Sequence, residues 1–130
     1  MKKRKPKNIK KDIWNLVSVY VRLTNSVGGY CKCVSCGELR HWQEMQCGHF
    51  VHSKDKAWID IRNLNPQCGL CNLGDGQIGY TEWMQEQYGL EYEDVRDDLK
   101  RLKKVPRKYT NEELENMLQY WKDKTKEMGE

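Results

Sequence analysis

The sequence predicts an α+β fold in which a small zinc-stabilised core is flanked by amphipathic helices. Two Cys-x-x-Cys pairs have the spacing of zinc knuckles, and they consist of Cys33, Cys36, Cys68 and Cys71. Between the pairs, residues 39–62 contain short mixed segments that suit two strands and a joining loop. Before and after the pairs, apolar residues recur at helical spacing. We therefore expect helices on the outside and an irregular, zinc-bound centre.

Charge and helical periodicity divide the chain into a basic arm and one folded domain. We predict a flexible arm at 1–10 and a domain at 11–128, with its core at about 31–80 and carboxy-terminal helices at about 81–128. The formal net charge is +4, but the first eleven residues contain seven Lys or Arg side chains and no acid. The other 119 residues hold 16 basic and 19 acidic side chains, so the positive charge is concentrated at the amino terminus.

The first element is predicted to be an amphipathic helix over residues 11–26. Its apolar stripe consists of Ile13, Leu16, Val17, Tyr20, Leu23 and Thr24. Gly28 and Gly29 then stop the helix. Beyond the first cysteine pair, Phe50-Val51 and Trp58-Ile59 are the apolar runs that we expect in the two short strands.

Three helices are predicted after the second cysteine pair. Thr81 is placed to cap a helix from Glu82 to Tyr88, with Gly89 as its stop. The next helix carries the stripe Tyr92, Val95, Leu99 and Leu102. After a linker-like stretch at 104–109, the capping-box sequence Thr110-x-x-Glu113 precedes a last helix. Its stripe is Leu114, Met117, Leu118, Trp121 and Met128.

Zinc is preferred to disulfide bonds as the explanation for the two cysteine pairs. Residues 1–6 are not followed by an apolar secretory core, and no apolar run approaches the roughly 20 residues of a membrane span. We therefore expect a reducing, intracellular compartment and no membrane partner. Cys31 and Cys47 are left over. Cys31 is an alternative to Cys33 in the first knuckle, and Cys47 is predicted to be a small buried residue.

Two basic clusters are predicted to attract the phosphate backbone of DNA. The expected contacts are Lys2, Lys3, Arg4, Lys5, Lys7, Lys10 and Lys11 in the arm, Arg62 in the centre, and Lys103, Lys104, Arg107 and Lys108 around Pro106. Lys100 and Arg101 extend the second cluster. Such clusters bind polyanions without reading base sequence. A solubilising tail and an ordinary solvated helix end are the alternative interpretation.

The centre of the chain holds residue types that suit phosphodiester hydrolysis, which needs a base and a divalent cation. His49 is the candidate base because it lies between the cysteine pairs, beside Gly48, and the four cysteines already satisfy a zinc ion. Asn72 follows the last cysteine, where its amide oxygen is a candidate ligand for Mg²⁺ or Mn²⁺. Asn63 and Asn65 are candidates to pin the intervening loop by bonding to its backbone.

The order of these residues resembles the phage lambda NinG (Rap) recombination proteins, within the HNH or His-Me finger nucleases. The motifs that carry the resemblance are Cys33-x-x-Cys36, Gly48-His49-Phe50, Arg62-Asn63 and Pro66-Gln67-Cys68-x-x-Cys71-Asn72. The chain is also similar to the zinc-containing Holliday-junction endonuclease VII of phage T4 in this order. The resemblance extends over about residues 11–128, and its specific part is 33–72.

The resemblance implies a ββα-metal finger with a structural zinc and a catalytic Mg²⁺ or Mn²⁺. In such a finger, His49 is the general base on the first strand, Asn63 orients the loop and Asn72 binds the catalytic ion. The chain departs from the family pattern at Gly48, where an acid or histidine is common. It also has Gln46 where relatives carry histidine or aspartate, and Asn65 where many carry histidine. Gln46, Asp60 and Asp75 are therefore candidates to complete the ion's ligands.

Two classes of function follow. The first is a metal-dependent DNA endonuclease of phage recombination that cleaves branched DNA such as Holliday junctions, in the host cytoplasm. A nicking or packaging endonuclease for ordinary duplex is a variant of it. The second is a zinc-stabilised DNA-binding module without turnover, favoured by Gln46 and Gly48. Because resolving a four-way junction needs two matched incisions, a homodimer is a further expectation.

Overall fold

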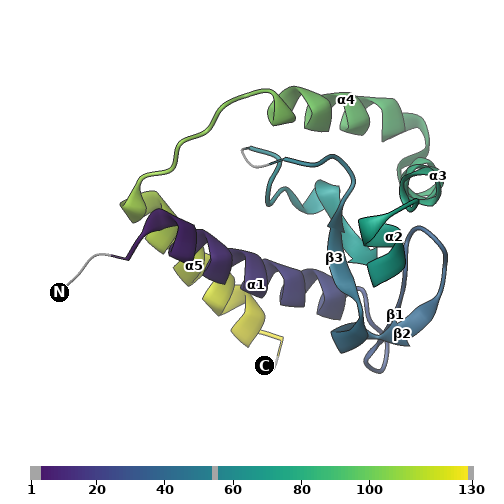
Figure 1. Cartoon of the computed structure of the whole chain (residues 1–130), viewed down its shortest axis with the longest axis horizontal. Helices are drawn as coiled ribbons and strands as arrows, with labels where there is room; N and C mark the ends of the chain where they lie inside the picture. The colour runs from purple at the N-terminus through teal and green to yellow at the C-terminus, as the bar shows by residue number, and fades with distance from the viewer. Residues whose placement is uncertain (1–3, 54–55, 129–130) are drawn as a thin grey trace.

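The protein is a mixed α+β fold whose described residues, in a computed structural model, are 4–53 and 56–128 (Figure 1). Its helices are α1 (Pro6–Thr24), α2 (Gly69–Leu73), α3 (Gln77–Tyr88), α4 (Tyr92–Lys103) and α5 (Asn111–Lys126). Its strands are β1 (Tyr30–Lys32), β2 (Leu39–His41), β3 (Gln46–His49) and β4 (Leu64–Gln67). None of the helices in these ranges combines the length with the hydropathy that a membrane span requires.

The first helix begins five residues earlier than predicted, at Pro6 instead of residue 11. Proline is favoured in the first turn, where its missing N–H is not needed. Ile9 lies one turn before Ile13 and is only 1% exposed, so the buried stripe of α1 extends into the predicted arm. Residues 6–10 are therefore helical and not a flexible arm. At the other end, Asn25 donates its side-chain amide to the Val21 carbonyl at 2.7 Å, which helps to stop α1 before Gly28.

The last helix packs beside α1 and begins with the predicted capping box (Figure 1). The Glu113 N–H donates to the Thr110 hydroxyl, and the Thr110 N–H donates to the Glu113 carboxylate, each at 3.1 Å. Such a cap stabilises a helix by about 1 kcal/mol. Buried apolar residues of both helices form one cluster with β3 and β4, and this cluster consists of Ile9, Ile13, Val17, Val21, Cys47, Leu64, Leu114, Leu118 and Trp121.

The central hairpin pairs β3 with β4 in antiparallel register, with Gly48 opposite Asn65 and His49 opposite Leu64. The second strand was predicted too early, near Trp58-Ile59, which lie in the loop before β4. Phe50-Val51 similarly follow β3 and are not part of it, although the Phe50 N–H donates to the Asn63 carbonyl at 2.9 Å. Strand β4 was not predicted because it contains polar residues and Pro66, which are uncommon in strands. All four of its residues are buried, and a two-stranded sheet tolerates the proline.

Helix α3 begins at Gln77, earlier than the predicted start at Glu82. Thr81 is not its cap, because the Thr81 hydroxyl donates to the Gln77 carbonyl at 2.9 Å inside the helix. Tyr80, within α3, is fully buried, and its hydroxyl donates to the Gly48 carbonyl at 2.9 Å. A second apolar cluster joins α3 and α4 to the segment after β3, and its members are Phe50, Val51, Ala57, Tyr80, Met84, Tyr92, Val95 and Leu99.

Candidate metal centre and catalytic cleft

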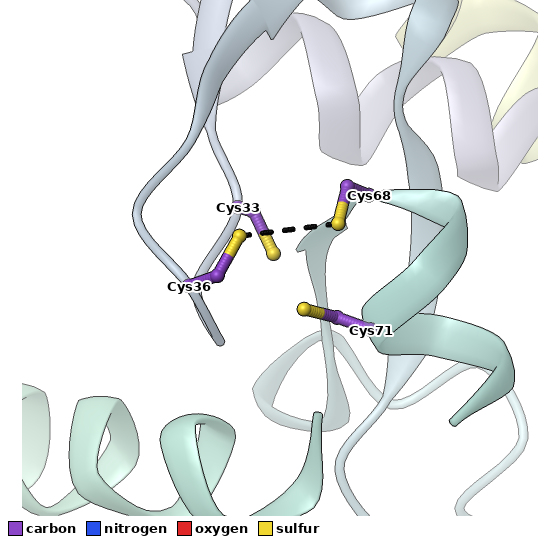
Figure 2. Close-up of side chains that lie close together, drawn as sticks. All are labelled: Cys33, Cys36, Cys68 and Cys71. Atoms are coloured by element: carbon purple, nitrogen blue, oxygen red, sulfur yellow. Dashed lines mark hydrogen bonds between the residues drawn. The ribbon is translucent and has the colours of Figure 1, made fainter. Parts of the chain in front are cut away.

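Four thiols from two distant segments converge on one point (Figure 2). Cys33 and Cys36 lie in the turn after β1, Cys68 precedes α2, and Cys71 is inside α2. All four Sγ atoms lie within 4.8 Å of one another, and the Cys36 and Cys68 sulfurs are 3.9 Å apart. Tetrahedral zinc with bonds of about 2.3 Å places its sulfurs about 3.8 Å apart. The donor set and its spacing therefore fit a zinc ion.

The surroundings of the cluster shift the pKa values of its thiols in opposite directions. Burial opposes ionisation of Cys33, but hydrogen bonds from the backbone of Cys68 and Cys36 outweigh it and lower the pKa of the Cys33 thiol to about 7. Burial, together with the neighbouring thiols, raises the pKa of Cys71. Without a cation the cluster therefore retains protons, which a bound zinc ion displaces.

The two remaining cysteines lie outside this cluster. Cys31 is buried on β1 and packs against the ligand set without belonging to it, so Cys33 supplies the first knuckle. Cys47 is buried between the hairpin and α1, as predicted for a small core residue. Burial raises the pKa of the Cys47 thiol to about 12, which keeps it protonated. All six cysteines are free of disulfide bonds.

His49 ends β3 and is held in one orientation by a stacked aromatic ring and a backbone carbonyl. Its ring stacks on Trp14 of α1, with centroids 4.8 Å apart and planes 10° from parallel. Its Nε2 lies 2.8 Å from the Trp58 carbonyl oxygen. Because a carbonyl only accepts, Nε2 carries the proton and Nδ1 is left as the basic nitrogen. Neither tryptophan contact could be read from the sequence, since Trp14 lies in a distant helix and the Trp58 contact is through its backbone.

Asn63 fixes the loop that carries the Trp58 carbonyl. Its Oδ1 accepts from the Val51 N–H at 2.7 Å, and its Nδ2 donates to the carbonyls of Val51 at 2.7 Å and Ala57 at 3.1 Å. The side chain is fully buried, so it ties both ends of the loop together away from solvent. Asn63 thus contacts the loop that bonds to the candidate base and does not contact the base itself.

Asn72 and Gln46 meet beside the hairpin. The Asn72 Nδ2 donates to the Gln46 Oε1 at 2.8 Å, which joins α2 to the first residue of β3. Both side chains, together with His49, line one cavity of about 520 Å³. Their amide oxygens are the hard donor type that Mg²⁺ and Mn²⁺ accept, although they are neutral and only two. Among the described residues, the four cysteines are the only close set of three or more Cys, His, Asp or Glu ligands.

The departures from the family pattern have structural reasons. A Cβ added to Gly48 would lie 1.7 Å from the Gln67 side chain, which donates to the Ser35 hydroxyl at 2.8 Å. An acidic residue therefore cannot occupy position 48 without displacing Gln67. Asn65 is buried and donates its Nδ2 to the Tyr80 hydroxyl at 3.2 Å. It therefore supports the hairpin and does not line the cavity that His49, Asn72 and Gln46 share. Asp60 is likewise engaged, because it pairs with Arg62 at 2.7 Å.

A second cavity of about 650 Å³ shares His49 and Asn72 with the first and extends to α4. His52 lines both cavities, and its ring is 6.3 Å from that of His49. Arg96, Lys100 and Lys103 of α4 line the larger cavity. Arg96 belonged to neither predicted basic cluster, since the approach of α4 to the end of β3 is a tertiary feature.

The predicted DNA-contacting residues fall into distinct environments. Lys7, Lys10 and Lys11 line a cavity with Trp14 and Trp58. Lys103 lines the larger cavity beside His49. Exposed members of the set include Lys5, Lys104 and Lys108. Protein carboxylates engage the three arginines: Arg4 pairs with Asp12, Arg62 with Asp60 and Asp98, and Arg107 with Glu113. Lys2 and Lys3 lie outside the described residues.

Comparison with known proteins identifies the family. The chain matches, over residues 1–130, the protein family described as Bacteriophage Lambda NinG protein. No curated protein and no solved structure matches the chain. The match covers the cysteine cluster, the hairpin and all five helices. The chain therefore belongs to the bacteriophage lambda NinG family of phage recombination-related proteins.

Proposed function

We propose that this protein is a metal-dependent DNA endonuclease of the HNH type that cleaves branched DNA during phage recombination. The observation that carries the proposal is the fixed His49 imidazole, which has one nitrogen bonded to the Trp58 carbonyl and shares a cleft with Asn72. The antiparallel β3–β4 hairpin followed directly by α2, with cysteines at both knuckles, supports a ββα-metal core of the kind that the motif order implies.

In the proposed reaction, the His49 Nδ1 accepts a proton from the water that attacks the scissile phosphate. The P–O bond to the leaving end of the strand breaks, and the leaving oxygen takes a proton from solvent water. The Nε2–H bond to the Trp58 carbonyl then stabilises the imidazolium, and Asn63 keeps that carbonyl in place through the loop. A bound Mg²⁺ or Mn²⁺ would neutralise charge on the phosphate. Asn72 and Gln46 would hold it, with oxygens of the DNA completing its ligands. The zinc cluster has a structural role, because four cysteines leave no open position.

The pH dependence of cleavage follows from the surroundings of His49. Burial lowers the pKa of this imidazole below its ordinary 6.5; the bond to Trp58 opposes the shift, and the nearby His52 adds to it. A base must be neutral, so the rate should rise with pH and level off once His49 is deprotonated. We expect the rate to reach half of its maximum at a pH below 6.5. In a His52→Ala variant this midpoint should move closer to 6.5, because the neighbouring imidazole no longer lowers the pKa of His49. A midpoint above 6.5 in the wild-type protein would contradict the assignment.

The substrate is tested by comparing a synthetic four-way junction with a linear duplex of the same arm sequence, in Mg²⁺ or Mn²⁺. We expect selective cleavage of the junction, with paired incisions of the kind that a two-fold dimer produces. Equal cleavage of both substrates would favour the nicking or packaging endonuclease that acts on ordinary duplex. The controls omit Mg²⁺ and Mn²⁺ from the buffer. They do not use a strong chelator, because the structural zinc must stay bound throughout.

A DNA-binding module without turnover is the second candidate. The observation that favours it is the lack of a carboxylate or histidine at positions 46 and 48, which leaves neutral amides as the protein ligands for a catalytic ion. The same comparison separates the two functions. Tight junction binding without any cleavage in either metal would establish the module.

A further inference from the structure

We propose that α4 forms a phosphate-binding wall of the catalytic cleft, in which Lys100 and Lys103 bind the backbone of the DNA strand that enters it. This inference rests on the proposed function, because it assigns the substrate-binding surface of the same site. The two lysines and Arg96 line the cavity that His49 and Asn72 also line. A strand whose phosphate reaches His49 therefore passes along this face of α4.

The sequence of α4 places these three cations on one side of the helix. Arg96, Lys100 and Lys103 are spaced by four and three residues, so their side chains are neighbours on the helix surface. Val95 and Leu99 are buried in the second apolar cluster and fix the rotation of the helix. The basic row is thereby directed to the cleft by the packing of the adjacent apolar row.

The arginines of α4 are paired with carboxylates of the same helix, whereas its cleft-lining lysines are not. Arg96 pairs with Asp97 at 2.9 Å, and Arg101 pairs with Asp98 at 2.7 Å. Within the described residues, Lys100 and Lys103 form no ion pair, and Lys100 is exposed. Like charges at this spacing repel one another and destabilise a helix slightly. An anion held between them would relieve that repulsion, and the phosphate backbone supplies a row of such anions.

A second basic surface adjoins His49 from the other direction. Lys7, Lys10 and Lys11 of α1 line a cavity with Trp14 and Trp58, the two residues that hold the His49 ring. In the view of Figure 1, α4 lies above β3, the strand that ends at His49, and α1 extends from β3 to the left. Basic residues of both helices therefore line cavities close to the candidate base, which suits a phosphate backbone that runs across the site.

The test is the salt dependence of DNA binding by the full-length chain. Binding of the four-way junction and of the linear duplex is measured over a series of salt concentrations in a His49→Gln background, which prevents cleavage. The test variant is Lys100→Gln with Lys103→Gln. Its matched control is Lys122→Gln with Lys126→Gln on α5, which also removes two exposed lysines, the second of each pair in the last turn of its helix. Circular dichroism and zinc content establish that all variants are folded.

We expect the α4 variant to lower the slope of log affinity against log salt by about two, with affinity about 10- to 100-fold weaker near 0.1 M salt. The control should keep the wild-type slope. An unchanged slope in the α4 variant, equal loss in both variants, or absence of DNA binding by the wild-type chain would overturn the inference. Cleavage by the unsubstituted protein is measured in parallel. If it fails while the α4 effect persists, the endonuclease proposal is wrong and the binding wall stands.

Discussion

Replacing His49 with Ala is expected to abolish cleavage of the four-way junction while leaving its binding intact. Loss of a general base lowers a rate by about 10²- to 10⁴-fold, which places residual cleavage near the limit of a gel assay. The proposed binding surfaces consist of lysines on α1 and α4 and do not include this ring, so affinity should stay within a factor of a few. Cleavage under single-turnover conditions and binding without divalent ion measure the two properties separately.

Two further substitutions separate chemistry from structure at this position. In a His49→Gln variant, the side-chain amide is able to donate to the Trp58 carbonyl, so the local fold is preserved without a basic nitrogen. It should be as inactive as His49→Ala. His41→Ala removes a histidine from β2 that accepts from the Gln43 N–H at 3.2 Å and serves as the control that retains activity. A soluble, fully active His49→Gln protein would refute the assignment of the base.

Replacing Cys68 with Ser is expected to unfold the domain. Cys68 is 2% exposed and connects β4 to α2, so its thiolate would tie the hairpin to the first knuckle through a bound zinc ion. Structural zinc in small domains contributes about 10 kcal/mol or more of apparent binding free energy, which is comparable to the entire folding stability of a typical domain, about 5–15 kcal/mol. The variant should lose zinc, helical circular dichroism and the cooperative thermal transition together.

The matched control for this variant is Cys47→Ala. It also removes a buried thiol, but one that belongs to the apolar cluster of α1 and α5 and not to the metal set. A cost of about 1 kcal/mol is expected, as for an average core substitution, with one zinc ion retained per chain. If Cys68→Ser kept both its zinc and its thermal transition, the four-cysteine site would be wrong.

Local patterns allowed several elements to be predicted from the sequence. The capping box at Thr110 and Glu113 forms as its spacing indicates, because a cap depends on residues within one helical turn. The cluster of four cysteines was identifiable because a Cys-x-x-Cys turn brings two sulfurs close together almost independently of what surrounds it. The candidate residues His49, Asn72 and Gln46 were also selected from motif order, and they share one cavity.

Element boundaries were wrong wherever distant packing overrode local propensity. The start of α1 depends on the burial of Ile9 against the rest of the protein, and the early start of α3 brings Tyr80 into the helix to bond the Gly48 carbonyl. Strand β4 contains Asn65, Pro66 and Gln67, none of which favours a strand by itself. Its pairing with β3 and its complete burial stabilise it there.

The sequence by itself determined the fold class, the four cysteines that cluster and the choice of the candidate base, since each depends on residue type and short spacing. Tertiary structure alone decided the state of that base. The ring of His49 is held by Trp14, 35 residues earlier in the chain, and by a backbone carbonyl that Asn63 secures. It also decided that α4 faces the cleft, because the direction of a basic row depends on how the helix packs, and packing involves residues that are distant in sequence.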